Sequence, residues 1–218
     1  MVPVEKVLEI VSKIRQLRNG DAADSMTRMG IIYPINYGVS IPNLKQIAAQ
    51  YIGSHNLAIT LFEQDIRECK ILASLIDDPA QVTGEQIDQW SAHFTNIEIV
   101  EQVCSNLFWR VEYSLPRSIE WCLGNDPLLI KAGLIITMRC AANSEVSDRT
   151  FDPFFEIIEN LPEGDEFDYG NYAVGALRQI AKRSSTFREK VQQTSQNLSN
   201  SESDVKAWIG NQLLFEFE

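Results

Sequence analysis

Cysteine and histidine are scarce in this sequence, which has four cysteines and two histidines among 218 residues. The cysteines form no CxxC pair, and no histidine stands at metal-ligand spacing, so we expect no metal site and no other cofactor. Each cysteine lies in an apolar helical segment, which predicts buried free thiols in a reducing compartment, the cytoplasm. The four positions are Cys69, Cys104, Cys122 and Cys140.

The sequence also lacks an unbroken apolar run long enough to span a bilayer. Its first residues, MVPVEKVLEIVSKIRQL, carry charges throughout and lack the basic-then-apolar order of a signal peptide. We therefore expect no membrane partner. Residues 4–18 are predicted to form an amphipathic helix of the folded domain.

Positive charge is in deficit: 19 lysines and arginines stand against 30 aspartates and glutamates, a formal net charge of -11. Such a chain repels polyanions, so nucleic-acid binding requires a local basic stripe. In the best candidate, Arg178 and Lys182 share a helix face one turn apart. The alternative is a solvated helix end, where cations suit the dipole. The cluster comprises Arg178, Lys182, Arg183, Arg188 and Lys190, with Arg67 and Lys70 as candidates to extend it.

Alternating β-branched segments are missing as well, and nearly every segment has helical periodicity. Apolar helices recur at intervals of roughly 30 to 45 residues, which is typical of HEAT-like repeats. The sequence therefore predicts an all-α superhelix of HEAT-like helical repeats, a solenoid, as one domain over residues 1–218. A single helical bundle is the alternative. The polar run 197–204 is predicted to be a loop. The recurring helices are expected at residues 66–76, 97–108, 128–142, 169–182 and 205–214.

Residues 88–108, DQWSAHFTNIEIVEQVCSNLF, are the segment on which the functional prediction depends. Thr95 or Asn96 is expected to cap a helix, since either side-chain oxygen accepts from an amide of the first turn. Glu98 and Glu101 lie early in this helix, where its dipole favours a carboxylate. Glu101 faces either a functional groove or solvent. The predicted buried stripe is Ile97, Val100, Cys104, Leu107 and Phe108.

Several segments, in order along the chain, resemble the AlkD-like family of DNA alkylation repair proteins. Residues 37–48, YGVSIPNLKQIA, are similar to the "GV…P.LR.iA" signature of that family. The resemblance extends from about residue 21 to about residue 190. The other similar segments are residues 55–62, 67–68 with 72–76, 90–104 and 172–183.

The resemblance implies a superhelix of HEAT-like repeats whose concave face cradles duplex DNA. It implies an N-glycosylase that removes positively charged alkylpurines without flipping the base into a pocket and without a metal. In this family tryptophans line the sugar of the lesion. An aspartate stabilises the sugar cation and orients water, and an arginine holds the backbone.

This sequence differs from the family pattern at those positions. Ile97 and Glu101 stand where the family has a tryptophan and then an aspartate, and Gly175 falls near the second tryptophan. Neither Ile97 nor Gly175 presents an aromatic face to a cationic nucleotide. Lys131 replaces the arginine, keeping its charge but not its bidentate fork. We predict Glu101 as the catalytic residue. The predicted nucleic-acid-binding residues are Lys131, Arg178, Lys182 and Arg183.

Two functions remain open at this point. The first is an alkylation-repair protein that binds duplex DNA and removes cationic alkylpurines. The second is a catalytically silent HEAT-repeat scaffold that binds a protein partner or non-canonical DNA, which the acidic balance favours. His55 and His93 have no convergent partners in the sequence and are assigned structural or surface roles. Four tryptophans are predicted to lie in the core rather than to stack on bases: Trp90, Trp109, Trp121 and Trp208.

Overall fold

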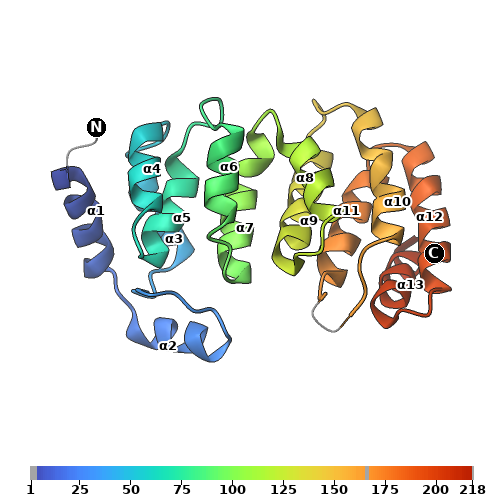
Figure 1. The fold of residues 1–218 in the computed structure, drawn as a ribbon, viewed down its shortest axis with the longest axis horizontal. Helices are drawn as coiled ribbons and strands as arrows, with labels where there is room; N and C mark the ends of the chain where they lie inside the picture. The colour runs from blue at the N-terminus through green and yellow to red at the C-terminus, as the bar shows by residue number, and fades with distance from the viewer. Residues whose placement is uncertain (1–3, 165–166, 218) are drawn as a thin grey trace. The chain divides into compact units, whose positions relative to one another are not determined.

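The computed structural model describes residues 4–164 and 167–217. These residues form α-helices, short 3-10 helices and loops, with one isolated β-bridge between Ile35 and Ile66. The chain divides into two compact units, Met1–Val111 and Glu112–Glu218, and within each unit short helices pack side by side (Figure 1). The predicted all-α class is confirmed, whereas the single domain over residues 1–218 stays a prediction.

Helix α5 is the centre of the first unit, because α3, α4 and α7 all pack against it. Nine of its ten residues are buried, as expected for a helix covered on several sides. Ser40 caps α3, because its side-chain oxygen accepts from the amide of Asn43. The elements of this unit are α1 (Val4–Gln16), α2 (Gly20–Arg28), α3 (Ile41–Ala48), α4 (His55–Phe62), α5 (Arg67–Ile76), α6 (Gly84–Ser91), α7 (Ile97–Asn106) and η1 (Phe108–Arg110).

The loop before α3 requires a glycine in the middle of the sequence Tyr-Gly-Val at residues 37–39. Gly38 has φ +68°, and a Cβ there would lie 2.0 Å from the Asn19 carbonyl oxygen, so only glycine fits. The buried Glu68 carboxylate accepts from the amides of Tyr37 and Val39 at 3.2 and 3.1 Å. The first residues of the motif at 37–48 therefore form a loop that one carboxylate holds to α5.

Arg67 and Lys70 do not extend a basic stripe, and that prediction is wrong. Arg67 is 1% exposed, and it donates to the Val39 carbonyl and to the Glu68 carboxylate, each at 2.9 Å. Lys70 is 6% exposed and donates to the Phe62 carbonyl at 2.7 Å, and burial lowers its pKa. Both cations lie on a helix covered on several sides, and internal acceptors take the place of water.

The second unit is built on α9, which packs against both α8 and α11, while α12 packs against α13. The α8–α9 contact includes a buried hydrogen bond of 2.7 Å from the Ser118 hydroxyl to the Gly133 carbonyl. The elements are α8 (Ser114–Cys122), α9 (Pro127–Ala141), η2 (Asp148–Phe151), α10 (Pro153–Glu159), α11 (Gly170–Ala181), α12 (Ser185–Ser199) and α13 (Asp204–Phe217).

The polar run 197–204 is only partly a loop, because α12 continues to Ser199 and α13 begins at Asp204. Leu198 is buried and holds the end of α12 in place, and the Asn200 side chain donates to the Gln196 carbonyl. Asn200 thus satisfies a carbonyl at the end of the helix, beyond the position where the helix was expected to end. No helix within the described ranges has the length and apolar character needed to cross a membrane.

The prediction for the cysteines and the predictions for two of the four tryptophans agree with the structure. All four thiols are free and buried, and burial raises the pKa of each. Trp90 and Trp121 are buried, and Trp90 stacks on Phe62 with a ring separation of 3.9 Å. Trp208 differs, because its ring lies against Gly170 near the start of α11 and remains 40% exposed.

Candidate nucleic-acid interface

Helix α7 carries the predicted catalytic residue, and Asn96 rather than Thr95 is its cap. The Asn96 side chain accepts from the Ile99 amide at 3.2 Å and donates to the Ile32 carbonyl at 3.2 Å. The predicted stripe is wrong at its start, because Ile97 is half-buried and Ile99 is fully buried instead. Ile97 and Glu101, one turn apart and both half-buried, therefore share an accessible face.

Glu98 has a structural role that the sequence did not reveal. Its carboxylate accepts two hydrogen bonds from the Arg67 guanidinium, at 2.8 and 2.6 Å. Together with Glu68, this arrangement pairs one buried arginine with two carboxylates. A bidentate pair of this kind fixes the carboxylate in one geometry. Of the two glutamates early in α7, Glu98 therefore has a structural role, and Glu101 is the candidate catalytic residue.

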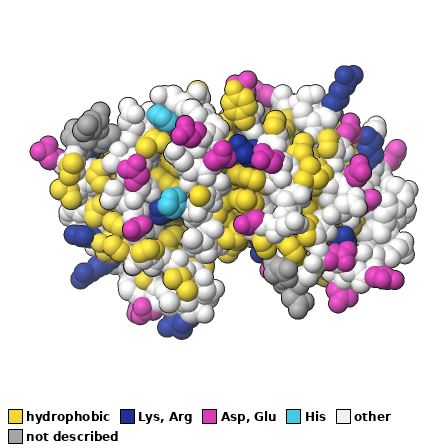
Figure 2. Space-filling view, viewed as in Figure 1, with side chains coloured by type: hydrophobic (Ala, Val, Ile, Leu, Met, Phe, Trp, Pro, Cys, Tyr) yellow, Lys and Arg dark blue, Asp and Glu magenta, His cyan; other side chains and the backbone are white. Residues whose placement is uncertain are grey.

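Charge is unevenly arranged on the surface. Figure 2 shows acidic side chains spread over the drawn face of each unit, with lysines and arginines occurring singly or in small groups. Arg178 on α11, its C-cap Lys182 and the following Arg183 lie in the second unit, as does Lys131, which is half-buried on the neighbouring helix α9. No ion pair or hydrogen bond joins the side chains of Lys131 or Lys182 to another part of the chain that the structure describes.

Arg178 is paired rather than open to solvent. Its guanidinium donates Nε–H to one Glu216 carboxylate oxygen at 2.7 Å, and Nη2–H to the other. The hydrogen bond from Arg178 lowers the pKa of Glu216, and the nearby charges of Arg178 and Lys182 act in the same direction. Glu216, on α13, therefore partly neutralises the stripe predicted on α11.

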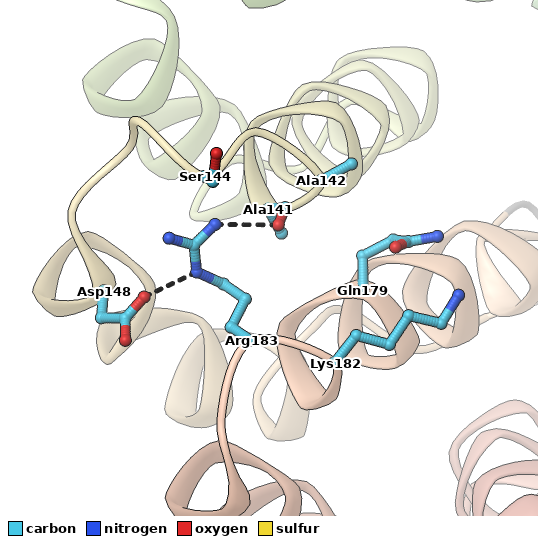
Figure 3. Close-up of a pocket in the computed structure, with 7 residues that line it drawn as sticks. All are labelled: Ala141, Ala142, Ser144, Asp148, Gln179, Lys182 and Arg183. Carbon is cyan, nitrogen blue, oxygen red and sulfur yellow. Dashed lines mark hydrogen bonds and ion pairs between the residues drawn. The ribbon is translucent and has the colours of Figure 1, made fainter.

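Lys182 and Arg183 line a hollow of about 540 Å³ between the ends of α9 and α11. Figure 3 shows the two side chains leaving the end of α11 in opposite directions, with Gln179 on the same side as Lys182. The residues lining the hollow are Ala141, Ala142, Ser144, Asp148, Gln179, Lys182 and Arg183.

Arg183 forms a clamp on the turn that follows α9. Its guanidinium donates to the carbonyls of Ala141 at 2.9 Å, Asn143 at 2.8 Å and Val146 at 2.5 Å. Its Nε–H donates to Asp148 at 2.7 Å. Four of the five N–H donors of the guanidinium are therefore used internally. This arginine shapes the hollow, whereas Lys182 brings the net charge to it.

The position of the second family aromatic is filled by a neighbour. A Cβ built at Gly175 would lie 2.8 Å from Met138 Sδ, which is closer than a carbon and a sulfur tolerate. Met138 belongs to α9 and Gly175 to α11, which pack together. A large aromatic side chain at residue 175 requires Met138 to move.

His55 has a partner that the sequence did not reveal, so its assignment as a residue without one is wrong. Its Nδ1 lies 2.7 Å from a carboxylate oxygen of Asp77, and the Gln86 amide donates to the other oxygen at 2.6 Å. Burial raises the pKa of Asp77, while the hydrogen bonds from His55 and Gln86 act against that rise. These residues come from three different elements, which hid the group from spacing arguments.

No group of three or more His, Cys, Asp or Glu side chains that could hold a metal ion occurs between residues 4–164 or 167–217. The ring of His93, the other histidine, packs edge-on against Phe62, with 5.8 Å between the two ring centroids.

Comparisons with known proteins agree with this architecture. The family model for "DNA alkylation repair enzyme" matches residues 10–201. A solved structure has a TM-score of 0.75 at 16% sequence identity, covering 95% of this chain and 94% of the other. It is described as representing a new family of proteins related to the HEAT-like repeat DNA glycosylases, with affinity for branched DNA structures. The predicted HEAT-like repeat fold is thereby confirmed. No curated protein matches the sequence.

Proposed function

The chain belongs to the DNA alkylation repair enzyme family, and from this we propose that it binds branched DNA through the backbone phosphates, using the α9 and α11 side chains of its second unit. The observation that carries the proposal is that Lys131 and Lys182 have no ion-pair partner in the described chain, although acidic residues outnumber basic ones. A cation without an internal carboxylate is the group that a phosphate recruits. Arg178 is held by Glu216 and becomes available for a third contact only when that carboxylate is removed.

The substituted aromatic positions favour binding without base removal. Excision of a cationic purine draws on aromatic faces beside the lesion, each worth about 1–2 kcal/mol as a cation–π contact. Ile97 provides no such face, and Met138 occupies the space beside Gly175. The affinity for branched DNA described for the structural relative is consistent with a DNA-binding role that needs no lesion.

Removal of cationic alkylpurines is the second candidate function. It is favoured by Glu101, a half-buried carboxylate on the same helix face as Ile97. Glutamate reaches one methylene further than aspartate, and a small misplacement of a catalytic group costs much of the rate. The assay is release of N7-methylguanine from duplex DNA by the native protein and by Glu101→Gln. Release by the native protein alone supports excision, and release by neither restricts the function to binding.

The binding proposal is tested by titrating a four-way junction and a duplex of equal length at several salt concentrations. The variants are Lys131→Gln and Lys182→Gln, each expected to reduce the slope of log affinity against log salt by about 0.9. Lys45→Gln is the matched control, because Lys45 likewise has no ion-pair partner in the described chain but lies on α3 of the first unit. Slopes that equal the control value contradict the proposed interface. Absence of binding to either DNA at low salt favours a protein partner instead.

A further inference from the structure

The hollow between the ends of α9 and α11 has the size and the chemistry of a small-ligand site. Its volume of about 540 Å³ lies within the roughly 300–1,000 Å³ typical of such pockets. All its lining residues belong to the second unit. The C-terminal ends of two helices meet here, and their dipoles alone disfavour an anion. Arg183 offsets this effect, because it occupies the last carbonyl of α9 and two carbonyls of the following turn.

The polar side chains that line the hollow differ in charge and in hydrogen-bonding chemistry. Asp148 and Arg183 neutralise each other. Three of its side chains form no hydrogen bond or ion pair in the described structure: the Lys182 ammonium, the Gln179 amide and the Ser144 hydroxyl. Lys182 and Gln179 are three residues apart on one helix face and extend to the same side (Figure 3). Ala141 and Ala142 add a small apolar surface beside them.

From this set we infer that the hollow receives one unpaired nucleotide of a branched DNA, an inference that rests on the proposed function. A single ammonium matches the single charge of a phosphodiester. A glutamine amide offers a donor and an acceptor together, the pattern that pairs with the N6 and N7 atoms of adenine. The alanine methyl groups suit the apolar face of a base. A branch point supplies a nucleotide that has already lost its pairing, so little unstacking energy is required.

The test compares two three-way junctions that differ at one position. One carries a single unpaired adenine at the branch point, and the other carries an abasic residue there. The native protein is expected to bind the adenine junction about tenfold more tightly, which is the size of one bidentate base contact. Gln179→Ala is expected to abolish this preference without weakening binding to the abasic junction. Lys182→Gln is expected to weaken binding to both junctions.

Gln46→Ala is the matched control, since Gln46 is an exposed glutamine without a described partner on α3 of the first unit. It is expected to retain the preference for adenine. Equal binding of both junctions by the native protein overturns the inference but leaves the proposed function intact. A preference that persists in Gln179→Ala also overturns it. If the native protein binds neither junction at low salt, the proposed function fails as well.

Discussion

Replacing Glu216 with glutamine is expected to strengthen DNA binding, because this carboxylate holds Arg178 through two hydrogen bonds. The lowered pKa of Glu216 keeps it charged at neutral pH, and the pairing weakens only as the pH falls through that lowered value, below 4.5. Removing the charge frees Arg178 for a phosphate. Of the four predicted nucleic-acid-binding residues, two cations then lack an ion-pair partner in the native protein, Lys131 and Lys182, and three lack one in the variant.

The size of the effect follows from counterion release. Each phosphate contact contributes about −0.9 to the slope of log affinity against log salt, so the slope is expected to change from about −1.8 to about −2.7. At 0.1 M salt one added contact corresponds to about eightfold tighter binding. Fluorescence anisotropy with a labelled four-way junction, at 50 to 300 mM salt, measures both quantities.

The control is Glu163→Gln, which changes the net charge equally but releases Lys206 instead. If Glu216→Gln and Glu163→Gln give the same slope, the gain comes from net charge rather than from Arg178, and the reasoning is refuted. A slope in Glu216→Gln equal to that of the native protein refutes it too.

Three further predictions concern stability and reactivity. Arg67→Met is expected to lower the free energy of unfolding, measured in urea, by about 3–5 kcal/mol, because it leaves two carboxylates near the core without their cation. Adding Glu98→Leu is expected to recover part of the loss. A loss below about 1 kcal/mol contradicts this prediction. Trp90→Ala is expected to cost about 3–5 kcal/mol, whereas Trp208→Ala, whose ring is 40% exposed, is expected to cost less, about 1–2 kcal/mol. Burial raises the pKa of Cys69 to about 12, so this thiol remains protonated at pH 8. The buried native thiols are expected to react with a disulfide reagent only as fast as the chain unfolds. Rapid reaction of a native thiol contradicts this prediction.

Local signals in the sequence predicted most of the fold. The capping oxygens of Ser40 and Asn96, the apolar spacing of α5 and the turn residues between helices depend on neighbours within a few positions. Such signals are readable without a structure. They failed at the end of α12, which runs to Ser199 inside the predicted loop and is capped there by the Asn200 side chain.

The candidate site was harder to predict from the sequence, because the residues that interact there are far apart along the chain. Arg183 resembles a surface cation, but the carbonyls that it binds lie 37 to 42 residues earlier in the chain. Arg67 and Glu98 are 31 residues apart, and His55 and Asp77 are 22 apart. A charge count therefore overestimates the cations available to DNA. Lys131 and Lys182, which the structure leaves without such partners, are the predicted residues best placed for that role.

The Arg67 clamp has a consequence for the face of α7 that carries positions 97 and 101. Because one guanidinium grips Glu98 with two hydrogen bonds and also holds the backbone at Val39, α7 is locked in rotation about its own axis. Positions 97 and 101 then project from the same place whichever side chains they carry. Exchanging the side chains at these two positions therefore changes the chemistry of that face without turning the helix that carries it.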